Sequence, residues 1–138
     1  MKKFKKITIS LFLMLALTLT GCRSKPLPEG MDADALVTSG REVLLLLVEG
    51  EYEAVHEMLR EDQRALFTAE DIRDVVTKQL DGAGEYKQIE DHMTTGSTIN
   101  NERYGIAVFY CDFSEEDVLI RVSFDPQMQL VGFALEQD

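Results

Sequence analysis

The sequence is poor in the residues that bind metals and nucleic acids. Its 138 residues include two cysteines and two histidines, which leaves almost no material for a structural zinc site. The 14 basic side chains are outnumbered by 25 acidic ones, so the formal net charge is -11. This charge argues against nucleic-acid binding, because that function needs lysine and arginine to neutralise phosphates. We expect no metal and no other cofactor, and at 45% hydrophobic residues we expect an ordered chain.

No hydrophobic run in the sequence is long enough to cross a membrane. Residues 7–19 are mostly apolar, but these 13 residues fall short of the roughly 20 that a spanning helix needs. A basic stretch with four lysines precedes them, which is typical of a secretory signal. The sequence Leu19-Thr20-Gly21-Cys22 follows. Its small residues suit a signal peptidase, and its cysteine supplies a thiol for lipid attachment.

This succession of charge, apolar run, small residues and cysteine resembles the lipobox of bacterial lipoproteins. The resemblance implies transfer of a diacylglyceryl group to Cys22, cleavage between Gly21 and Cys22, and often a further acyl chain on the new amine. It also implies a protein on the outer face of the bacterial cytoplasmic membrane, held there by its lipid chains. Residues 1–21 would be removed, residues 22–30 would form the lipidated cysteine and a short tether, and residues 31–138 a single domain. The alternatives are an ordinary secretory signal with an incidental Cys22 and, after it, an uncleaved anchor helix.

Removal of the signal makes the protein more acidic. Cleavage after Gly21 takes away four lysines, leaving ten basic against 25 acidic side chains and a net charge of -15. We expect such a domain to stand off an anionic bilayer, with only Arg23 and Lys25 near enough to favour the headgroups. With Cys22 consumed by lipid, Cys111 has no intramolecular partner. Its apolar neighbours predict that it is buried and unreactive.

Helical periodicity fills the first half of the predicted domain. Asp32 or Asp34 is expected to cap a helix that ends near Gly50 and is buried on more than one face. A second helix is predicted at 51–61, with Arg60 towards water. A third helix, expected to bury Ile72, Val75, Val76 and Leu80, begins after Thr68-Ala-Glu-Asp71, which resembles a capping box.

After Gly84 the apolar period becomes alternating, which predicts strands. Four strands are expected, at about residues 85–95, 103–113, 118–124 and 128–136. Short turns favour antiparallel pairing, so the fold class is α+β, with N-terminal helices on a curved four-stranded antiparallel meander that forms a cone. The second strand is apolar on both faces. One face takes the helices, and the other must be covered or remain an exposed apolar patch, which often marks a partner surface.

The distinctive motifs of this sequence are structural: they are helix junctions, helix caps and strand alternation. They occupy residues 46–55, 66–71, 84–86, 122–125 and 130–133. Over about residues 35–135 the chain resembles a nuclear transport factor 2-like (cystatin-like) domain and, more closely, a domain of unknown function found in lipoproteins of Gram-positive bacteria. The resemblance implies the cone-shaped fold and an envelope location. The resemblance does not indicate a reaction, because folds of this kind serve as enzymes, as ligand pockets and as dimerisation modules.

His56 is the most interesting ionisable residue. On a helical wheel it falls on the inward face near Tyr52, Val55 and Leu59. A His56–Tyr52 pair inside a cone could do general acid–base work, because a buried imidazole can be tuned near neutrality. The favoured interpretation is a histidine at the core boundary, bonded to water or a backbone carbonyl. One helix position provides no partner geometry.

The remaining polar clusters predict no metal site. Glu90, Asp91 and His92 lie on a polar strand whose adjacent residues point to opposite faces, which favours a solvated surface. Calcium sites need about six to eight oxygens around one loop with a glycine at its turn, and none of the acidic runs has that pattern. The sequence also lacks a nucleophile elbow and a phosphate-binding loop.

Three hypotheses for function follow. The first is a non-catalytic, lipid-anchored extracytoplasmic module that works through its sheet face or its cone pocket, either as a homodimer or by binding an envelope protein. The second is a small-ligand-binding protein or pocket enzyme of the nuclear transport factor 2-like type that uses His56 and Tyr52. The third is a regulatory or immunity-type lipoprotein that acts on the envelope of its own producer. The missing catalytic set favours the first.

Overall fold

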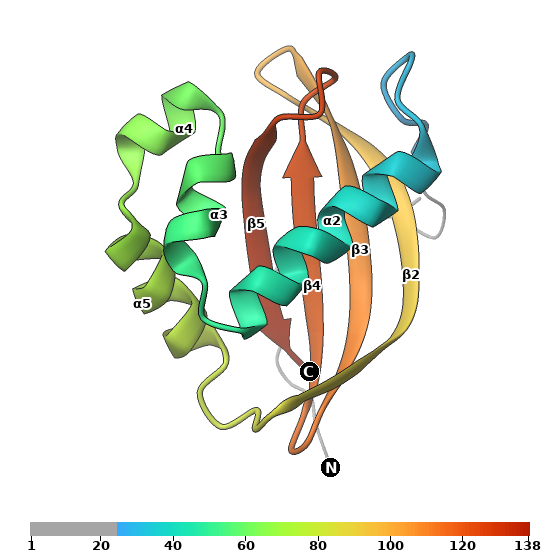
Figure 1. The fold of residues 1–138 in the computed structure, drawn as a ribbon. Helices are drawn as coiled ribbons and strands as arrows, with labels where there is room; N and C mark the ends of the chain where they lie inside the picture. Colours follow the sequence, from blue (N-terminus) through green and yellow to red (C-terminus); the bar gives the residue numbers. More distant parts are fainter. Residues whose placement is uncertain (1–24) are drawn as a thin grey trace.

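The computed structural model describes residues 25–138, so the predicted signal peptide and Cys22 lie outside the described residues. The helices are α2 (Ala33–Val48), α3 (Tyr52–Met58), α4 (Glu61–Leu66) and α5 (Ala69–Gln79). The strands are β2 (Tyr86–Ile99), β3 (Glu102–Phe113), β4 (Asp117–Phe124) and β5 (Leu130–Gln137), which form one antiparallel sheet in the order β2-β3-β4-β5. The predicted α+β architecture, with helices packed on a four-stranded meander, is confirmed (Figure 1).

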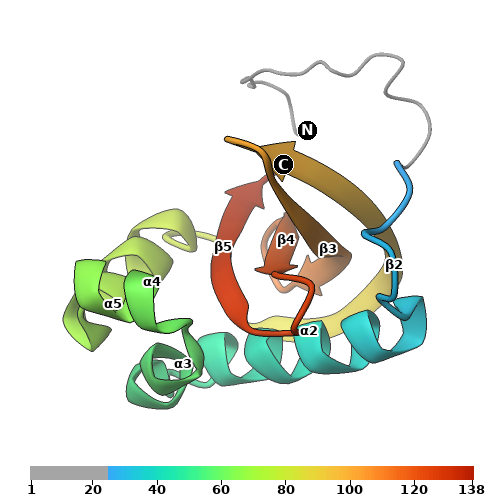
Figure 2. The ribbon, with the colours of Figure 1, turned by 90° about the horizontal axis from the view of Figure 1, so that it is seen from above.

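Helix α2 lies across the concave side of the sheet (Figure 2). Its N-cap is Asp32, whose carboxylate accepts a hydrogen bond from the Ala35 amide at 2.9 Å. A Cβ atom at Gly40 would lie 2.8 Å from Cβ of Ala107 and 3.0 Å from the ring of Phe109. The helix therefore approaches β3 closely at this point. Its apolar face fills the concave side of the predicted cone through Leu36, Gly40, Val43, Leu44 and Leu47.

The helix predicted at 51–61 is shorter, since α3 ends at Met58, and a helix that the sequence did not predict, α4, follows at Glu61–Leu66. The helical conformation stops at Leu59, whose backbone is extended and forms a parallel bridge to Leu130 of β5. The Arg60 amide donates to the Leu130 carbonyl at 2.7 Å. Pairing with a distant strand therefore overrides the local helical pattern. Helix α5 begins at Thr68 with both capping-box bonds to Asp71, as its sequence predicts.

The two faces of the sheet follow the alternation of β3. On the helix side Phe109 pairs with Ile120 and Cys111 with Val118, and all four side chains are buried. On the opposite side, which we call the outer face, stand Ile106, Val108 and Tyr110. The register places Met93 of β2 opposite Val108, and Leu119 of β4 opposite Tyr110. The doubly apolar character predicted for this strand is therefore present.

The first described residues, 25–28, lie against the end of β2; we call them the N-terminal clasp. The Gly96 amide donates to the Lys25 carbonyl at 3.0 Å, and the Lys25 amide donates to Oγ1 of Thr95 at 2.9 Å. A Cβ atom at Gly96 would collide with the carbonyl oxygen of Pro26, so glycine is required there. Arg103 reaches the Leu27 carbonyl at 3.5 Å. Within residues 25–138, no helix combines the length and hydrophobicity needed to span a bilayer.

Candidate functional site

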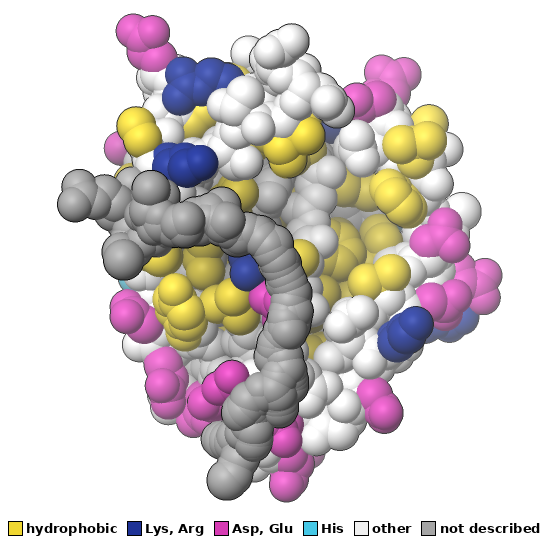
Figure 3. All heavy atoms as spheres, turned by 180° about the vertical axis from the view of Figure 1, so that it is seen from behind, with side chains coloured by type: hydrophobic (Ala, Val, Ile, Leu, Met, Phe, Trp, Pro, Cys, Tyr) yellow, Lys and Arg dark blue, Asp and Glu magenta, His cyan; other side chains and the backbone are white. Residues whose placement is uncertain are grey.

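The outer face carries the clearest candidate surface. Figure 3 shows hydrophobic side chains gathered on this side of the molecule, with acidic side chains around its margin. Tyr110 is 44% exposed, and its hydroxyl donates to Sδ of Met93 at 3.7 Å. Leu119 of β4 is its register partner, and Val108, which is 6% exposed, stands two residues earlier on the same face. An exposed aromatic ring on an apolar surface is typical of protein contact sites.

A depression of about 840 Å³ continues this face at the C-terminal end of β3. Tyr110 and Leu119 are among its apolar lining residues. The charged lining residues are Glu90, Asp117, Glu136 and Asp138, together with Lys78 from α5. Glu136 is paired with Arg121 at 3.0 Å, whereas the other acids leave the depression with an excess of negative charge. Its chemistry suits a ligand with both apolar and cationic groups.

Arg60 is the centre of a polar cluster at the other end of the sheet. Its guanidinium contacts three carboxylates: Asp62 at 2.9 Å, Glu102 at 2.6 Å and Asp125 at 3.1 Å. The Tyr104 hydroxyl donates to Glu102 at 2.7 Å. The Asp125 side chain is only 3% exposed and also accepts from the Gln127 and Gln129 amides. The cluster therefore ties the α3–α4 junction to the β2–β3 and β4–β5 turns.

The pKa values in the cluster reflect these contacts. Hydrogen bonds from Arg60 hold the pKa values of Asp62 and Glu102 below their ordinary range. The same carboxylates raise the pKa of Arg60, and the hydrogen bond to Asp62 has the largest effect. The hydrogen bond to Glu102 raises the pKa of Tyr104. The prediction that Arg60 points towards water is wrong, since its side chain is only 17% exposed. The guanidinium is saturated with partners, so the cluster fastens elements together rather than binding a ligand.

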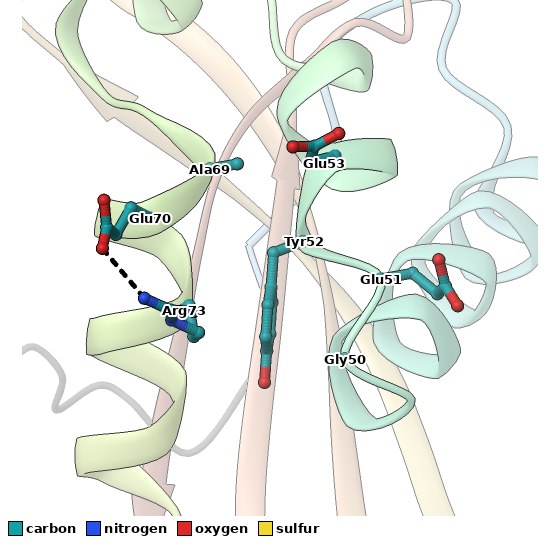
Figure 4. A pocket seen from close by; sticks show the side chains of 7 residues that line it. All are labelled: Gly50, Glu51, Tyr52, Glu53, Ala69, Glu70 and Arg73. Carbon is teal, nitrogen blue, oxygen red and sulfur yellow. Dashed lines mark hydrogen bonds and ion pairs between the residues drawn. The ribbon is translucent and has the colours of Figure 1, made fainter.

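The structure places His56 and Tyr52 in different surroundings. Tyr52 lines a shallow depression of about 540 Å³ with Glu70 and Arg73, which pair at 2.9 Å. In Figure 4 the ring of Tyr52 points away from α3 and lies between α5, which carries Arg73, and the turn at Gly50. His56 does not line this depression. Its Nε2 lies 2.7 Å from the Phe67 carbonyl and 3.2 Å from the Arg64 carbonyl. Both partners are carbonyl oxygens, which only accept hydrogen bonds, so Nε2 is protonated and is the hydrogen-bond donor.

The other sequence candidates are separate from one another. His92 is exposed on β2, with its ring centre 6.4 Å from that of Phe109. The described part of the chain contains no group of three or more histidine, cysteine, aspartate or glutamate side chains placed to hold a metal ion. Cys111 is 2% exposed, and burial raises the pKa of its thiol to about 12. The lipidation candidate, Cys22, lies outside the described residues.

Residues 41–133 match the family described as "Protein of unknown function (DUF3887)". The chain belongs to this family. The DUF3887 match runs from the middle of α2 to Phe133 in β5, so it covers both the outer face and the Arg60 cluster. The expected resemblance to a domain of unknown function is confirmed, while the family description names no reaction, ligand or location.

One solved structure is similar over most of this DUF3887 chain. It is described as "NMR structure of protein from Ruminococcus gnavus ATCC 29149" and aligns with a TM-score of 0.68 and 26% sequence identity. The alignment covers 80% of this chain and 96% of that one. No curated protein matches the chain. The comparisons therefore support the fold and the family.

Proposed function

We propose that the protein is a non-catalytic, lipid-anchored module outside the cytoplasmic membrane. In this proposal the thiol of Cys22 carries the lipid, and the outer face docks a basic, partly apolar segment of an envelope protein. The anchor is supported by the lipobox-like sequence that ends at Cys22. The docking role is supported by the arrangement of the outer face, where Tyr110 borders an acid-lined depression of about 840 Å³.

Charge favours a basic partner over a second copy of the chain. After cleavage the chain carries 25 acidic and ten basic side chains. Two copies that met through the depression would bring Glu90, Asp117 and Asp138 of each towards the same side chains of the other. Like charges in contact disfavour such a dimer, whereas lysine or arginine beside an apolar side chain would complement both parts of the surface.

The acid–base alternative receives no support from the position of His56. In that alternative His56 and Tyr52 act as a pair inside one pocket. Nε2 of His56 donates to backbone carbonyls of Phe67 and Arg64, and Tyr52 faces a different, open depression. This arrangement agrees with the core-boundary histidine favoured from the sequence.

The anchor is tested by replacing Cys22. We expect the wild-type chain to incorporate labelled fatty acid in its native host and to float with membranes on a density gradient. The Cys22→Ser chain should keep its signal peptide, take up no label and migrate at the precursor mass. Ser24→Ala is the matched control and should be processed normally. Labelling of Cys22→Ser, or a wild-type chain without label, would contradict lipid anchoring.

The docking surface is tested by photo-crosslinking in intact cells. A benzophenone amino acid replaces Tyr110, and in a matched control it replaces Phe67, which is 47% exposed but lies after α4. We expect a discrete heteromeric adduct from position 110 and none from position 67. Glu90→Gln with Asp117→Asn should remove the adduct, whereas Glu53→Gln with Glu70→Gln, which removes equal charge elsewhere, should leave it.

Three results would contradict the proposed surface. An adduct of twice the protomer mass would indicate a homodimer instead. Equal adducts from positions 67 and 110 would mean that the contact is not specific to the outer face. An adduct that survives neutralisation of Glu90 and Asp117 would exclude a partner held by its positive charge.

A further inference from the structure

We propose that the anchored domain rests directly against the bilayer with its β2–β3 hairpin end, and that the acid-lined depression points away from the membrane. This inference rests on the proposed lipid anchor at Cys22. It adds an interaction surface, made by the hairpin and the N-terminal clasp, whose partner is a lipid surface. Two features of the described residues carry it: the clasp and the hairpin tip.

The clasp limits the distance between the domain and its anchor. Lys25 is held on β2 by the two hydrogen bonds to Gly96 and Thr95. Only Arg23 and Ser24 separate it from Cys22. Three Cα–Cα steps of about 3.8 Å span at most about 11 Å, even in a fully extended chain. Residues 25–28 lie against the sheet, so they cannot lengthen the connection between the domain and its anchor.

Covalent length outweighs the electrostatic repulsion of the acidic domain. The lipid chains of Cys22 place its sulfur at the headgroup level, and the polar zone on each side of a bilayer is only about 5–7 Å thick. Repulsion between the domain and anionic lipid is screened within about 8 Å at physiological ionic strength. It can turn the domain about the anchor, but it cannot lengthen the two-residue connection. The surface around Lys25 therefore meets the headgroups.

The surface near the clasp suits this contact. Ile99 is 56% exposed at the tip of the β2–β3 hairpin, where Asn100 and Asn101 adopt positive φ angles of 53° and 68°. Figure 1 places this hairpin and the clasp at the same end of the sheet. Arg103, which reaches the clasp at Leu27, and Lys25 are both exposed. An apolar tip beside two cations is a combination that an anionic lipid surface favours.

The opposite end of the sheet is acidic. The β3–β4 turn contains Glu115 and Glu116, and Asp117 follows as the first residue of β4. Asp138 lies nearby, since its amide donates to the Asp117 carbonyl. The 12 residues of β3 separate this turn from the hairpin. At about 3.4 Å per residue, that length corresponds to roughly 35–40 Å. The hairpin end also carries carboxylates, at Asp62, Glu102 and Asp125, but these are paired with Arg60. The short connection to the anchor therefore sets the orientation, which leaves the depression open to a partner.

The orientation is tested with single fluorescent labels on the mature lipidated protein. An environment-sensitive dye is attached at Ile99→Cys and, as a control, at Val75→Cys, a 46% exposed position on α5. Cys22 is blocked by lipid, and Cys111 is buried. The protein is reconstituted on phosphatidylcholine vesicles that contain phosphatidylglycerol and a headgroup-attached quencher. We expect strong quenching at position 99 and none at position 75 beyond the level of a soluble, non-lipidated control.

Two further variants separate the clasp from the anchor. Insertion of about twelve Gly-Ser residues between Ser24 and Lys25 adds roughly 20 Å of mean reach and should lower the quenching at position 99. Gly96→Ala should lower it as well, because the added Cβ displaces Pro26. Melting curves show whether this variant still folds, and the insertion does not disturb the sheet.

The outcomes distinguish the two proposals. A protein that floats with the vesicles but shows equal quenching at positions 99 and 75 overturns the orientation and leaves the anchor intact. The orientation is likewise overturned if quenching at position 99 persists unchanged after the insertion. A mature protein without lipid, which does not float, overturns the anchor and the orientation together.

Discussion

Arg60 shows how one residue can organise several parts of this protein. It is the one described side chain that joins Asp62 in α4, Glu102 in β3 and Asp125 after β4. The buried carboxylate of Asp125 accepts hydrogen bonds from Arg60 and from the Gln127 and Gln129 amides. A carboxylate held in this way is costly to leave without its cation.

Replacing Arg60 should therefore destabilise the fold in a pH-dependent way. At pH 7 we expect Arg60→Met to lower the free energy of unfolding by about 2 kcal/mol, measured by urea denaturation, because Asp125 loses its counter-charge. The pKa values of Asp62 and Glu102 are lowered in the folded state. Their contribution is thus present above about pH 4 and is lost as the pH falls through the lowered values.

The difference between wild type and Arg60→Met should accordingly shrink towards pH 3. Arg73→Met is the control, because its pair with Glu70 is exposed and such pairs contribute about 0–1 kcal/mol. An equal loss of stability in both variants at pH 7, or a difference that stays constant down to pH 3, would contradict the role assigned to Arg60.

Cys111 should be chemically inert as long as the protein is folded. A thiol pKa of about 12 leaves far less thiolate at pH 8 than an ordinary cysteine has. In a Cys22→Ser chain, where Cys111 is the remaining thiol, we expect a disulfide reagent to react about a thousandfold faster in urea than under native conditions. An added Val75→Cys thiol should react at once in both. Rapid native reaction of Cys111 would show that the site opens to solvent.

At the scale of elements, α2 packs against β3 through the smallest available side chain. Gly40 faces Ala107, and a new Cβ there would lie 2.8 Å from the alanine methyl. Overpacking typically lowers the free energy of unfolding by about 1–3 kcal/mol, and the better helix propensity of alanine raises it by about 1 kcal/mol. We expect Gly40→Ala to destabilise the fold by about 1 kcal/mol in chemical denaturation.

A double-mutant cycle checks the cause of that loss. Combining Gly40→Ala with Ala107→Gly restores the space, so the pair should be less destabilising than the sum of the single changes. Thr38→Ala, on the exposed side of the same helix, changes propensity without a clash and should not destabilise. Strict additivity of the two mutations would mean that the helix-to-strand contact is not the cause.

The elements predicted best were those whose signals are local. The caps at Asp32 and Thr68 act over three residues, so their bonds follow directly from sequence. The break at Leu59 could not be predicted in this way, because its cause is Leu130, which lies in β5. Val75 has helical spacing with Ile72 and Val76, yet it is 46% exposed, since spacing alone does not reveal how wide the covered stripe is.

At the scale of the whole molecule, the acidic excess opposes folding and, in our proposal, assists partner binding. Raising the salt concentration screens repulsion among the 25 acidic side chains. Between low salt and about 0.3 M sodium chloride we expect the melting temperature to rise by about 3 °C. The same salt should weaken the adduct at position 110 in membranes isolated from the cells. A melting temperature that falls with salt would show that ion pairs such as those of Arg60 outweigh the repulsion.

The sequence by itself determined that helices precede a four-stranded meander, the faces of β3 and the acidic character, because caps, turns and alternation depend on neighbouring residues. The candidate anchor at Cys22 is also a sequence property. Only the tertiary structure decided the Arg60 cluster, whose partners are up to 65 residues away, and the clasp, whose partner Thr95 is 70 residues from Lys25. Such contacts exist only once the chain has folded, and no local sequence pattern predicts them. The same reason separates His56 from Tyr52, since the two carbonyls that hold the histidine reach it only when α4 folds back on α3.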